Sequence, residues 1–262
     1  MADGSEAVKL AFDGQIAVIS YDRPEKHNAA NDAMDRRLFE ILAELQQRPG
    51  LRAVVWRGEG ASFSSGRDTS QIGVRSEPIS DFEFIERGHR GTQLLFTLPA
   101  PTLVALKGWV IGGSFERALL CDVRVAGESA KMRLPEIAYG VVPDSGGTAR
   151  LFQMAGHGLA ADLALSGRVM TADEALRHGI VSRVVPDEKL DETVMEMARA
   201  IASAPEFTVK MFLRTLRRLA NPLVQHSLAE ESLAQSLVFG SADYREMKAA
   251  RAEQREPRYR GR

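Results

Sequence analysis

Residues 102–126 read TLVALKGWVIGGSFERALLCDVRVA, and the class of fold can be inferred from this stretch. The apolar run at 102–106 has the length and composition of a buried strand. A glycine pair, Gly112-Gly113, then opens a helical pattern that continues through residue 121, and 122–126 is a second strand-forming run. Strand, turn and helix in repeated succession are typical of layered α/β cores. The sequence therefore predicts an α/β fold.

The same alternation extends toward the N-terminus. Two β-rich runs at 8–12 and 15–21 flank Asp13-Gly14, a dipeptide that favours a hairpin turn. Asp32 is the predicted cap of a helix whose apolar residues recur at helical spacing and which ends near residue 49. The next predicted elements are a strand at 53–56, a polar segment at 69–80 and a helix at about 81–97.

Beyond Pro186 the pattern becomes mainly helical. We therefore expect two parts, a core of residues 1–190 and a helical C-terminal region of residues 191–262. Residues 245–262 hold seven Lys and Arg against three Glu, a balance of +4. This basic tail is either a solvated surface or a contact for an anionic ligand or a neighbouring subunit.

Composition excludes several classes of protein. The chain has 262 residues, of which 44% are hydrophobic and 26% charged, and these values are ordinary for a globular protein and unlike those of a disordered chain. The 34 Lys and Arg nearly balance the 35 Asp and Glu, giving a net charge of −1. A surface built throughout to hold nucleic acid is therefore not expected, and only a local basic patch could serve that purpose.

Cysteine and histidine usage points to a reducing compartment. Cys121 is the single cysteine, so no internal disulfide can form, and the five histidines are scattered without zinc-ligand spacing. We expect no bound metal. The N-terminus lacks the basic and apolar segments of a secretory signal, and no run approaches the roughly 18 apolar residues of a membrane helix. The expected localisation is cytoplasmic, with no membrane partner.

Two small-residue turns place backbone amides where chemistry could use them. The first spans residues 62–68, directly after a predicted strand, and the second is the Gly112-Gly113 pair at a helix start. Amides at a helix N-terminus lack intrahelical acceptors, and glycine allows a ligand to approach them closely. Two such N–H groups that converge on one oxygen form an oxyanion hole, worth roughly 3–4 kcal/mol per donor. The alternative is that these glycines only shape the turns.

Two carboxylates accompany these turns. Glu116 lies in the first turn of the predicted helix, and Glu136 follows Pro135 in a loop. Beside an oxyanion hole, such a pair could hold a water molecule, with one group accepting its proton and the other donating a proton to carbon. The alternatives are a helix-dipole partner for Glu116 and a cap or surface role for Glu136. No nucleophile elbow, phosphate loop or dinucleotide fingerprint occurs, and Cys121 is interpreted as a core residue.

In combination, these segments resemble the enoyl-CoA hydratase/isomerase (crotonase) superfamily over nearly the full chain. The segments that carry the resemblance, in chain order, are Arg23-Pro24, Asn28-Ala29, Phe63 through Asp68, Lys107-Gly108, Gly112 through Glu116, Cys121-Asp122, Pro135-Glu136-Ile137, Gly146-Gly147-Thr148, Gly179-Ile180-Val181 and Arg255-Glu256-Pro257. Each is weak by itself, and the ordered set is specific to the superfamily but not to one reaction within it.

The resemblance implies a spiral of repeated ββα units, followed by a C-terminal helical region that packs chains into homotrimers, often paired as hexamers. It also implies an acyl-CoA substrate, with coenzyme A as part of that substrate and no cofactor. By position, the amides of Ser65 and Gly113 would form the oxyanion hole, Glu136 would donate a proton to the α-carbon and Glu116 would hold the water added at C3. The implied substrate-binding residues are Lys26, His27, Ala29, Ser65, Gly66, Arg67, Asp68, Ile72 and Gly112.

This sequence departs from the family pattern at several positions. Arg67 stands where the family usually has alanine, and Asp144 where typical hydratases carry glycine. An acid at the latter position resembles dienoyl-CoA isomerases and aryl-CoA dehalogenases, so Asp144 is either a further catalytic acid or a structural residue of its turn. Arg251 and Gln254 replace a phenylalanine and a lysine that commonly touch the neighbouring subunit's CoA.

The leading functional hypothesis is hydration of a trans-2-enoyl-CoA to a 3-hydroxyacyl-CoA, because both Glu116 and Glu136 are present. The first alternative is an enoyl- or dienoyl-CoA isomerase that uses Asp144 as an additional acid or base. The second is a non-catalytic acyl-CoA-binding or RNA-binding member that uses the basic tail, and the retained glutamate pair argues against it.

Overall fold

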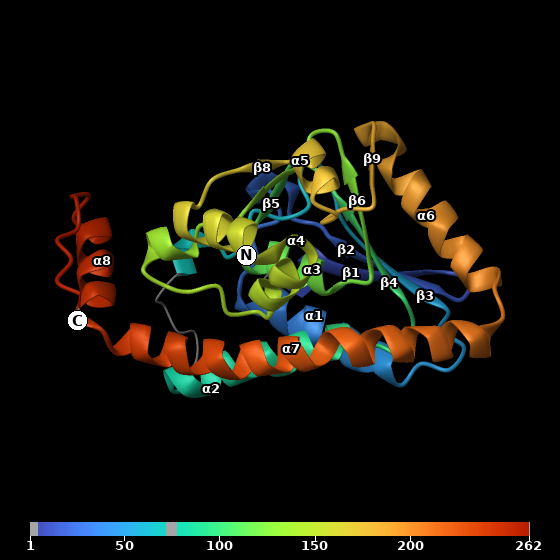
Figure 1. The fold of residues 1–262 in the computed structure, drawn as a ribbon, viewed down its shortest axis with the longest axis horizontal. Helices are drawn as coiled ribbons and strands as arrows, with labels where there is room; N and C mark the ends of the chain where they lie inside the picture. The colour runs from blue at the N-terminus through green and yellow to red at the C-terminus, as the bar shows by residue number, and fades with distance from the viewer. Residues whose placement is uncertain (1–4, 72–77, 262) are drawn as a thin grey trace.

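A six-stranded sheet forms the centre of the computed structural model, which describes residues 5–71 and 78–261 (Figure 1). The strand order is β1-β2-β3-β4-β6-β9, and all neighbours are parallel except β1 and β2. The bounds are β1 (Val8–Asp13), β2 (Ile16–Tyr21), β3 (Ala53–Gly58), β4 (Thr102–Leu106), β6 (Val123–Gly127) and β9 (Arg183–Val185). The antiparallel β1–β2 pair confirms the hairpin predicted at Asp13-Gly14.

A second, smaller layer repeats beside this sheet. Its strands are β5 (Trp109–Ile111), β7 (Lys131–Arg133) and β8 (Met170–Thr171). Single parallel bridges continue the layer, joining Ser64 to Val110 and Ala30 to Arg67. Successive turns of the chain thus give one strand to the large sheet, one extended segment to the small layer and then a helix. This arrangement confirms the predicted α/β spiral of ββα units.

Eight α-helices are present in the described part of the chain: α1 (Asp32–Gln46), α2 (Asp81–Phe96), α3 (Gly113–Leu120), α4 (Gly147–Ser166), α5 (Ala172–Arg177), α6 (Asp187–Ser203), α7 (Glu206–Gly240) and α8 (Ala242–Ala252). Short 3₁₀ helices occur at Ser5–Ala7, Pro24–Lys26, Thr69–Gln71 and Glu136–Tyr139. The predicted cap of α1 is wrong by one residue. Asn31 accepts the Met34 N–H at 2.9 Å because it has the extended backbone of a cap, whereas Asp32 already lies inside the helix.

Both faces of the large sheet are buried at the central strands β2, β3, β4 and β6, whereas the edge strands β1 and β9 are partly exposed. One face packs under α6 through Leu190, Val194 and Ala198, and the other packs against a cluster to which α1 and α3 contribute. The central strands β2, β3 and β4 therefore read as largely apolar runs, as expected for parallel strands covered on two sides. The division predicted at residue 190 falls inside α6, and α6 packs on the sheet (Figure 1).

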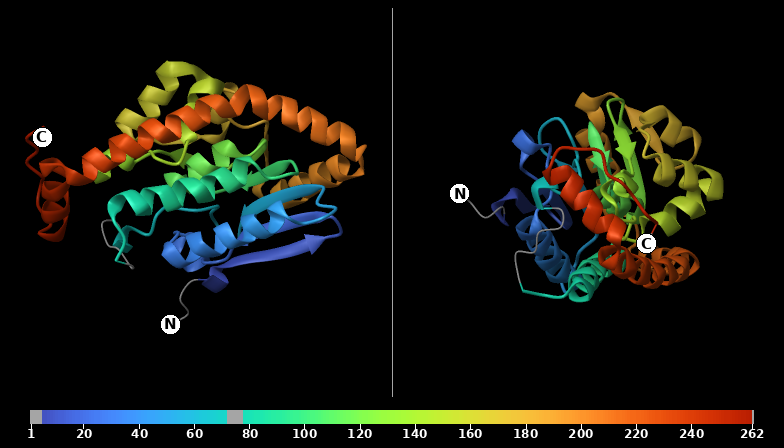
Figure 2. Two further views of the ribbon diagram at one scale, coloured as in Figure 1. Left: turned by 90° about the horizontal axis from the view of Figure 1, so that it is seen from below. Right: turned by 90° about the vertical axis from the view of Figure 1, so that its left-hand side faces the viewer.

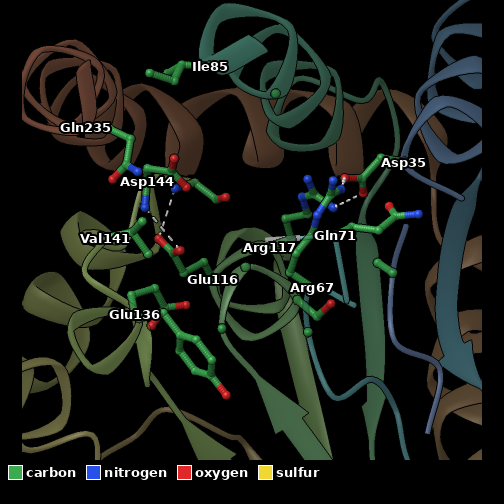
Figure 3. Close-up of a pocket in the computed structure, with 18 of the residues that line it drawn as sticks. Asp35, Arg67, Gln71, Ile85, Glu116, Arg117, Glu136, Val141, Asp144 and Gln235 are labelled. Carbon is green, nitrogen blue, oxygen red and sulfur yellow. Dashed lines mark hydrogen bonds and ion pairs between the residues drawn. The ribbon is translucent and has the colours of Figure 1, made fainter. Parts of the chain in front are cut away.

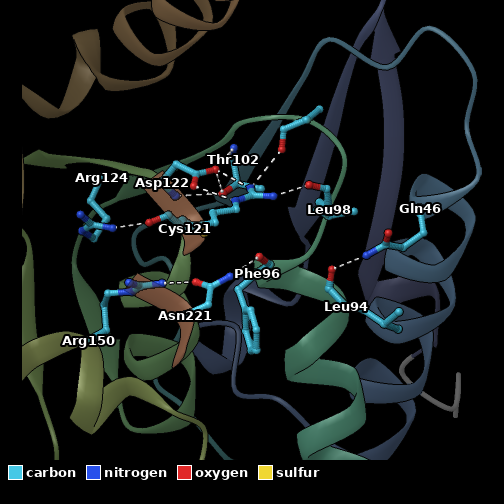
Figure 4. A network of polar contacts seen from close by, with 12 residues as sticks. Gln46, Leu94, Phe96, Leu98, Thr102, Cys121, Asp122, Arg124, Arg150 and Asn221 are labelled. Carbon is cyan, nitrogen blue, oxygen red and sulfur yellow. Dashed lines mark hydrogen bonds and ion pairs between the residues drawn. The ribbon is translucent and has the colours of Figure 1, made fainter. Parts of the chain in front are cut away.

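Helix α7 runs along the outside of this core, and α8 projects at its far end (Figures 1 and 2). A polar network fixes α7 to the loop after α2 (Figure 4). Arg217 binds Asp122 at 2.7 Å and donates to the Ala100 carbonyl at 3.3 Å, while Asn221 accepts from Arg150 at 3.0 Å. One partly buried ion pair and several further hydrogen bonds thus set the position of α7 relative to the core. Within residues 5–71 and 78–261, no helix is both long and apolar enough to cross a membrane.

Candidate active site

A cavity of about 290 Å³ opens between the small layer, helices α1 to α3 and the corner where α7 meets α8. Its walls carry two separate groups of charged side chains (Figure 3). Glu116, Glu136 and Asp144 line one side, which we call the acid wall. The other side carries a group of paired charges, which we call the ion-pair wall and which consists of Asp32, Asp35, Arg67 and Arg117.

Glu116 projects from the first turn of α3 and is almost completely buried. Its carboxylate accepts the backbone N–H groups of Asp144 at 3.3 Å, Ser145 at 3.0 Å and Gly147 at 3.2 Å. Gly147 is required at this point, because a Cβ there would lie 2.5 Å from the Cα of Glu116. Glu116 is therefore held in one orientation by the backbone of the neighbouring loop.

Glu136 begins the 3₁₀ helix that follows Pro135. One of its carboxylate oxygens, Oε2, is buried and has no hydrogen-bond partner among the described residues. Burial raises the pKa of Glu136 to about 8, and the charge of Asp144 adds to this effect. At neutral pH this carboxyl group is mainly protonated, and it carries a transferable proton inside the cavity.

The other two acids of this wall are shifted in the same direction. Burial raises the pKa of Asp144 to about 6. Burial also raises the pKa of Glu116 well above its usual range, and the charges of Glu136, Glu231 and Asp144 raise it further. Because like charges in a poorly solvated site oppose each other, the three groups cannot all be ionised together. The acid wall thus shares protons among its members near neutral pH.

The ion-pair wall has the opposite character. Arg67 contacts Asp32 at 2.5 Å and Asp35 at 3.5 Å, and Arg117 contacts Asp35 at 2.6 Å. Two guanidinium groups therefore face two carboxylates. Arg67 is the residue of this group that extends from the turn at 62–68.

The backbone amides near the cavity correct one predicted role. The Ser65 N–H donates to the His27 carbonyl at 2.8 Å, so it is already engaged and is not the free oxyanion donor that the resemblance assigned. In the bridge between Ala30 and Arg67, the Ala30 N–H donates to the Gly66 carbonyl and the Asp68 N–H donates to the Ala30 carbonyl. The N–H of Arg67 itself takes no part in this pairing and points away from Ala30. Within the described residues, the N–H groups of Arg67 and Gly113 have no acceptor, and both residues line the cavity.

The structure brings some of the predicted substrate-binding residues together and not others. Ser65, Gly66, Arg67 and Gly112 line the cavity, as do Gly113 and the three acids. The described cavity lining does not include Lys26, His27, Ala29 or Asp68. Ile72 lies outside the described residues.

Asp68 is used within the turn that carries it. Its carboxylate binds Arg23 at 3.0 Å and accepts the Ser70 N–H at 3.1 Å and hydroxyl at 2.7 Å. Burial alone would raise the pKa of Asp68, but these contacts outweigh burial and lower it. Asp68 therefore stays ionised and stabilises the turn.

Sequence reasoning did not find the residues that reach this site from α2 and α7. His89 Nε2 bonds the Asp144 carbonyl at 2.7 Å, Glu231 accepts the Gly146 N–H at 2.9 Å and Gln235 accepts the Val142 N–H at 2.9 Å. Polar residues four apart on a helix are typical of a solvated face, so the spacing of Glu231 and Gln235 carried no signal of a buried role.

Comparison with known proteins identifies the family. Residues 11–262 match the family model described as enoyl-CoA hydratase/isomerase. The chain is 32% identical to a short-chain-enoyl-CoA hydratase of Clostridium acetobutylicum, with 95% of each chain covered. It is 34% identical to a carnitinyl-CoA dehydratase of Salmonella arizonae, with 98% of this chain and 99% of the relative covered.

A solved structure agrees. The enoyl-CoA hydratase/isomerase of Pseudoalteromonas atlantica T6c superposes with a TM-score of 0.87 at 27% identity, over 97% of this chain and all of that one. The α/β spiral is thus also the fold of a solved enoyl-CoA hydratase/isomerase. The chain belongs to the enoyl-CoA hydratase/isomerase family and is an enzyme.

Proposed function

We propose that the protein catalyses the reversible addition of water across the C2=C3 double bond of an enoyl-CoA, giving a 3-hydroxyacyl-CoA. The observation that carries this proposal is the contrast between Glu136 and Glu116 on one wall. Glu136 has a buried, unpartnered carboxyl oxygen and a pKa of about 8. Glu116 is fixed by three backbone donors. One group is suited to donate a proton and the other to hold a reactant.

In this scheme the thioester carbonyl of the substrate accepts the N–H groups of Arg67 and Gly113, which stabilise the enolate oxygen. The reactive protonation state has the proton on Glu136 and leaves Glu116 ionised, held by its three N–H donors. Water bound to Glu116 attacks C3 and leaves its proton on that carboxylate. Glu136 then gives its proton to C2, and the enolate returns to a thioester. The product gains one hydroxyl and one hydrogen, and proton exchange between the two carboxyl groups restores the starting state. The scheme requires no cofactor, since coenzyme A enters as part of the substrate.

The names of the relatives support this choice. A hydratase and a dehydratase, such as those of Clostridium acetobutylicum and Salmonella arizonae, carry out one kind of reaction in opposite directions. Both relatives are at least 32% identical to this chain over 95% or more of its length. The acyl groups named for these relatives are the substrates of those proteins. The acyl group that this enzyme accepts is determined by the experiment described below.

A homotrimer, alone or paired as a hexamer, is the assembly that we propose. Helix α7 exposes large apolar side chains, including Phe207, Phe212, Leu219, Leu233 and Leu237. A row of such residues on one long helix is a surface suited to burial against other subunits. The molar mass in solution, measured by light scattering, tests this proposal, and a monomer would contradict it.

A second candidate function rests on Asp144. This acid lines the same cavity as Glu116 and Glu136, and burial raises its pKa to about 6. Such a group can accept a proton from one carbon of the acyl chain while Glu136 returns a proton to another. The outcome would be migration of the double bond without addition of water.

Mass-resolved product analysis in H₂¹⁸O distinguishes the two functions. The purified protein is mixed with a short panel of enoyl-CoA substrates of different chain length and polarity. A product heavier by one labelled water establishes hydration and identifies the preferred acyl group. An unlabelled product of unchanged mass with a shifted double bond would assign the reaction to the isomerase scheme.

A further inference from the structure

The loop at residues 142–147 has an unusual hydrogen-bond pattern. Each of its backbone N–H groups is accepted by a side chain from another element. Gln235 accepts that of Val142, Glu116 accepts those at 144, 145 and 147, and Glu231 accepts that of Gly146. Residue 143 is proline, which has no N–H to satisfy. The conformation of this loop is therefore set by acceptors on α3 and α7.

Glu231 is the member of this set that the proposed chemistry does not use. It lies on α7, is 7% exposed, and its Oε2 accepts the Gly146 N–H at 2.9 Å. Its other oxygen, Oε1, accepts the Ser227 hydroxyl at 2.6 Å. A buried carboxylate with both oxygens bonded has one defined orientation, so Glu231 can transmit the position of α7 to the loop.

The loop lies close against α7 at this point. Gly146 has a left-handed backbone with φ of 77°, and a Cβ there would approach Val224 at 3.1 Å and Leu228 at 3.3 Å. Gly146 is flanked by residues whose N–H groups hold the Glu116 carboxylate. A change in the Gly146 contact would therefore displace two of the three donors that fix Glu116.

We propose that Glu231 is a positioning residue that holds the 144–147 loop and thereby sets the orientation and proton affinity of the acid wall. The proposal rests on the proposed function, since it assigns Glu231 a role in the reaction of Glu116 and Glu136. Glu231 acts through the backbone and through its charge, and it is not among the residues that line the cavity.

The elements packed around the 142–147 loop carry several other charged or titratable groups. Glu116 lies on α3, Asp144 on the loop itself, and His89 and Glu86 on α2, where Glu86 faces Ser232 of α7 at 3.5 Å. The negative charge of Glu231 raises the pKa of both Glu116 and Asp144. Removal of that charge, with the hydrogen bonds kept, should therefore make the acid wall easier to ionise.

Two substitutions separate the hydrogen bond from the charge. In E231Q the amide oxygen accepts the Gly146 N–H and the amide nitrogen donates to Ser227, so the loop stays in place. In E231A the Gly146 N–H loses its acceptor in a buried position. The matched control is E230Q, the same chemical change at the exposed neighbouring position on α7.

The experiment measures kcat, KM and the pH dependence of kcat for each variant, with hydrogen exchange at residues 142–147. For E231A we expect a fall in kcat of about 10- to 100-fold with little change in KM, together with faster exchange in the loop. For E231Q we expect kcat within a few-fold of the parent and a pH profile moved to lower pH by on the order of 0.5–1 unit. E230Q should match the parent in every measurement.

A parent-like kcat and parent-like exchange in E231A would overturn the proposal, and so would an E231Q pH profile that coincides with the parent's. If E231A does not fold, the E231Q profile still gives the decision. Failure of the proposed function is distinguishable, because the parent would then add no water to any enoyl-CoA in the panel. In that case hydrogen exchange in the loop decides by itself whether Glu231 holds it.

Discussion

The acid wall and the ion-pair wall face each other across one cavity, yet their charged groups are held in different ways. On the ion-pair wall, side chains bind side chains, and Arg67 and Arg117 neutralise Asp32 and Asp35. On the acid wall, the side chain of Glu116 binds only backbone donors, and a carboxyl oxygen of Glu136 binds no partner within the described residues. Ion pairs fix the side chains of one wall in place, whereas on the other wall burial outweighs the nearby positive charges, and its carboxyl groups retain protons that chemistry can use.

The largest effect is expected from E136Q, which removes the transferable proton and keeps the size of the side chain. We expect kcat to fall by about 10²- to 10⁴-fold, the usual contribution of general acid–base catalysis. Binding of a saturated acyl-CoA, measured by calorimetry, should be nearly unchanged, because Glu136 is assigned no role in holding the thioester.

The control for this variant is E192Q on α6, an exposed position on a helix that packs on the large sheet. It should retain parental kcat and binding. A parental kcat in E136Q would remove Glu136 from the reaction and would leave the acid wall without its proposed donor.

The next effect concerns how the acid wall is built. G147A would introduce a Cβ at 2.5 Å from the Cα of Glu116, and neither backbone can move away freely. We expect a loss of about 1–3 kcal/mol in the free energy of unfolding, typical of overpacking, together with a fall in kcat because Glu116 is displaced. Denaturant unfolding and turnover measure the two effects.

Gly158 provides the comparison in the second segment of α4, beyond the kink at Gly156. A Cβ there would meet nothing within 4 Å, so G158A should leave kcat unchanged and should not destabilise the fold. Equal losses in G147A and G158A would mean that close packing around Glu116 is not the cause.

How much of this site can be predicted from the sequence depends on how local the contacts are. Glu116 and Glu136 can be selected as candidates from the sequence because each stands beside a signal of its own, a glycine pair and a proline. Glu231 and Gln235 were missed because their partners lie 85 and 93 residues away in the chain. The fold was predicted more fully, since strand and helix patterns are repeated along the whole core.

The error at Ser65 has the same origin. Whether a backbone N–H is free depends on which carbonyl faces it, and the carbonyl that faces Ser65 belongs to His27. His27 and Asn28 adopt left-handed backbone conformations, with φ of 48° and 55°. A spacing pattern around residues 62–68 holds no information about that distant turn, so only the structure shows which N–H groups of the 62–68 segment lack an acceptor among the described residues.

A smaller effect is expected on the ion-pair wall. R67A leaves Asp32, which is 6% exposed, without its closest counter-charge. We expect a loss of about 1–3 kcal/mol in the free energy of unfolding, below the range for a fully buried pair because Arg67 is partly exposed. kcat should change less than tenfold, since the substitution keeps the backbone N–H at residue 67.

A double variant tests the cause. R67A combined with D32N removes both charges, and it should recover part of the stability lost in R67A alone. If D32N adds a further loss instead, the pairing with Asp32 is not what Arg67 contributes.

The smallest effect is a difference in how pH acts on the two regions. Glu136 has a folded-state pKa of about 8 against an ordinary value of 4.5, so the folded protein holds a proton that the unfolded chain has released. The contribution of Glu136 to stability is therefore complete below pH 4.5 and is lost as the pH rises toward 8.

Asp68, in the turn that carries Arg67, has a lowered pKa, so its contribution to stability is complete above its ordinary pKa of 3.8 and is lost as the pH falls. Melting temperatures between pH 3 and 9 should therefore show E136Q gaining on the parent from pH 5 to 8, and D68N approaching the parent only below pH 4. Parallel curves for the parent and E136Q would mean that Glu136 titrates alike in the folded and unfolded chains, and the acid wall would then lose the property that distinguishes it from the ion-pair wall.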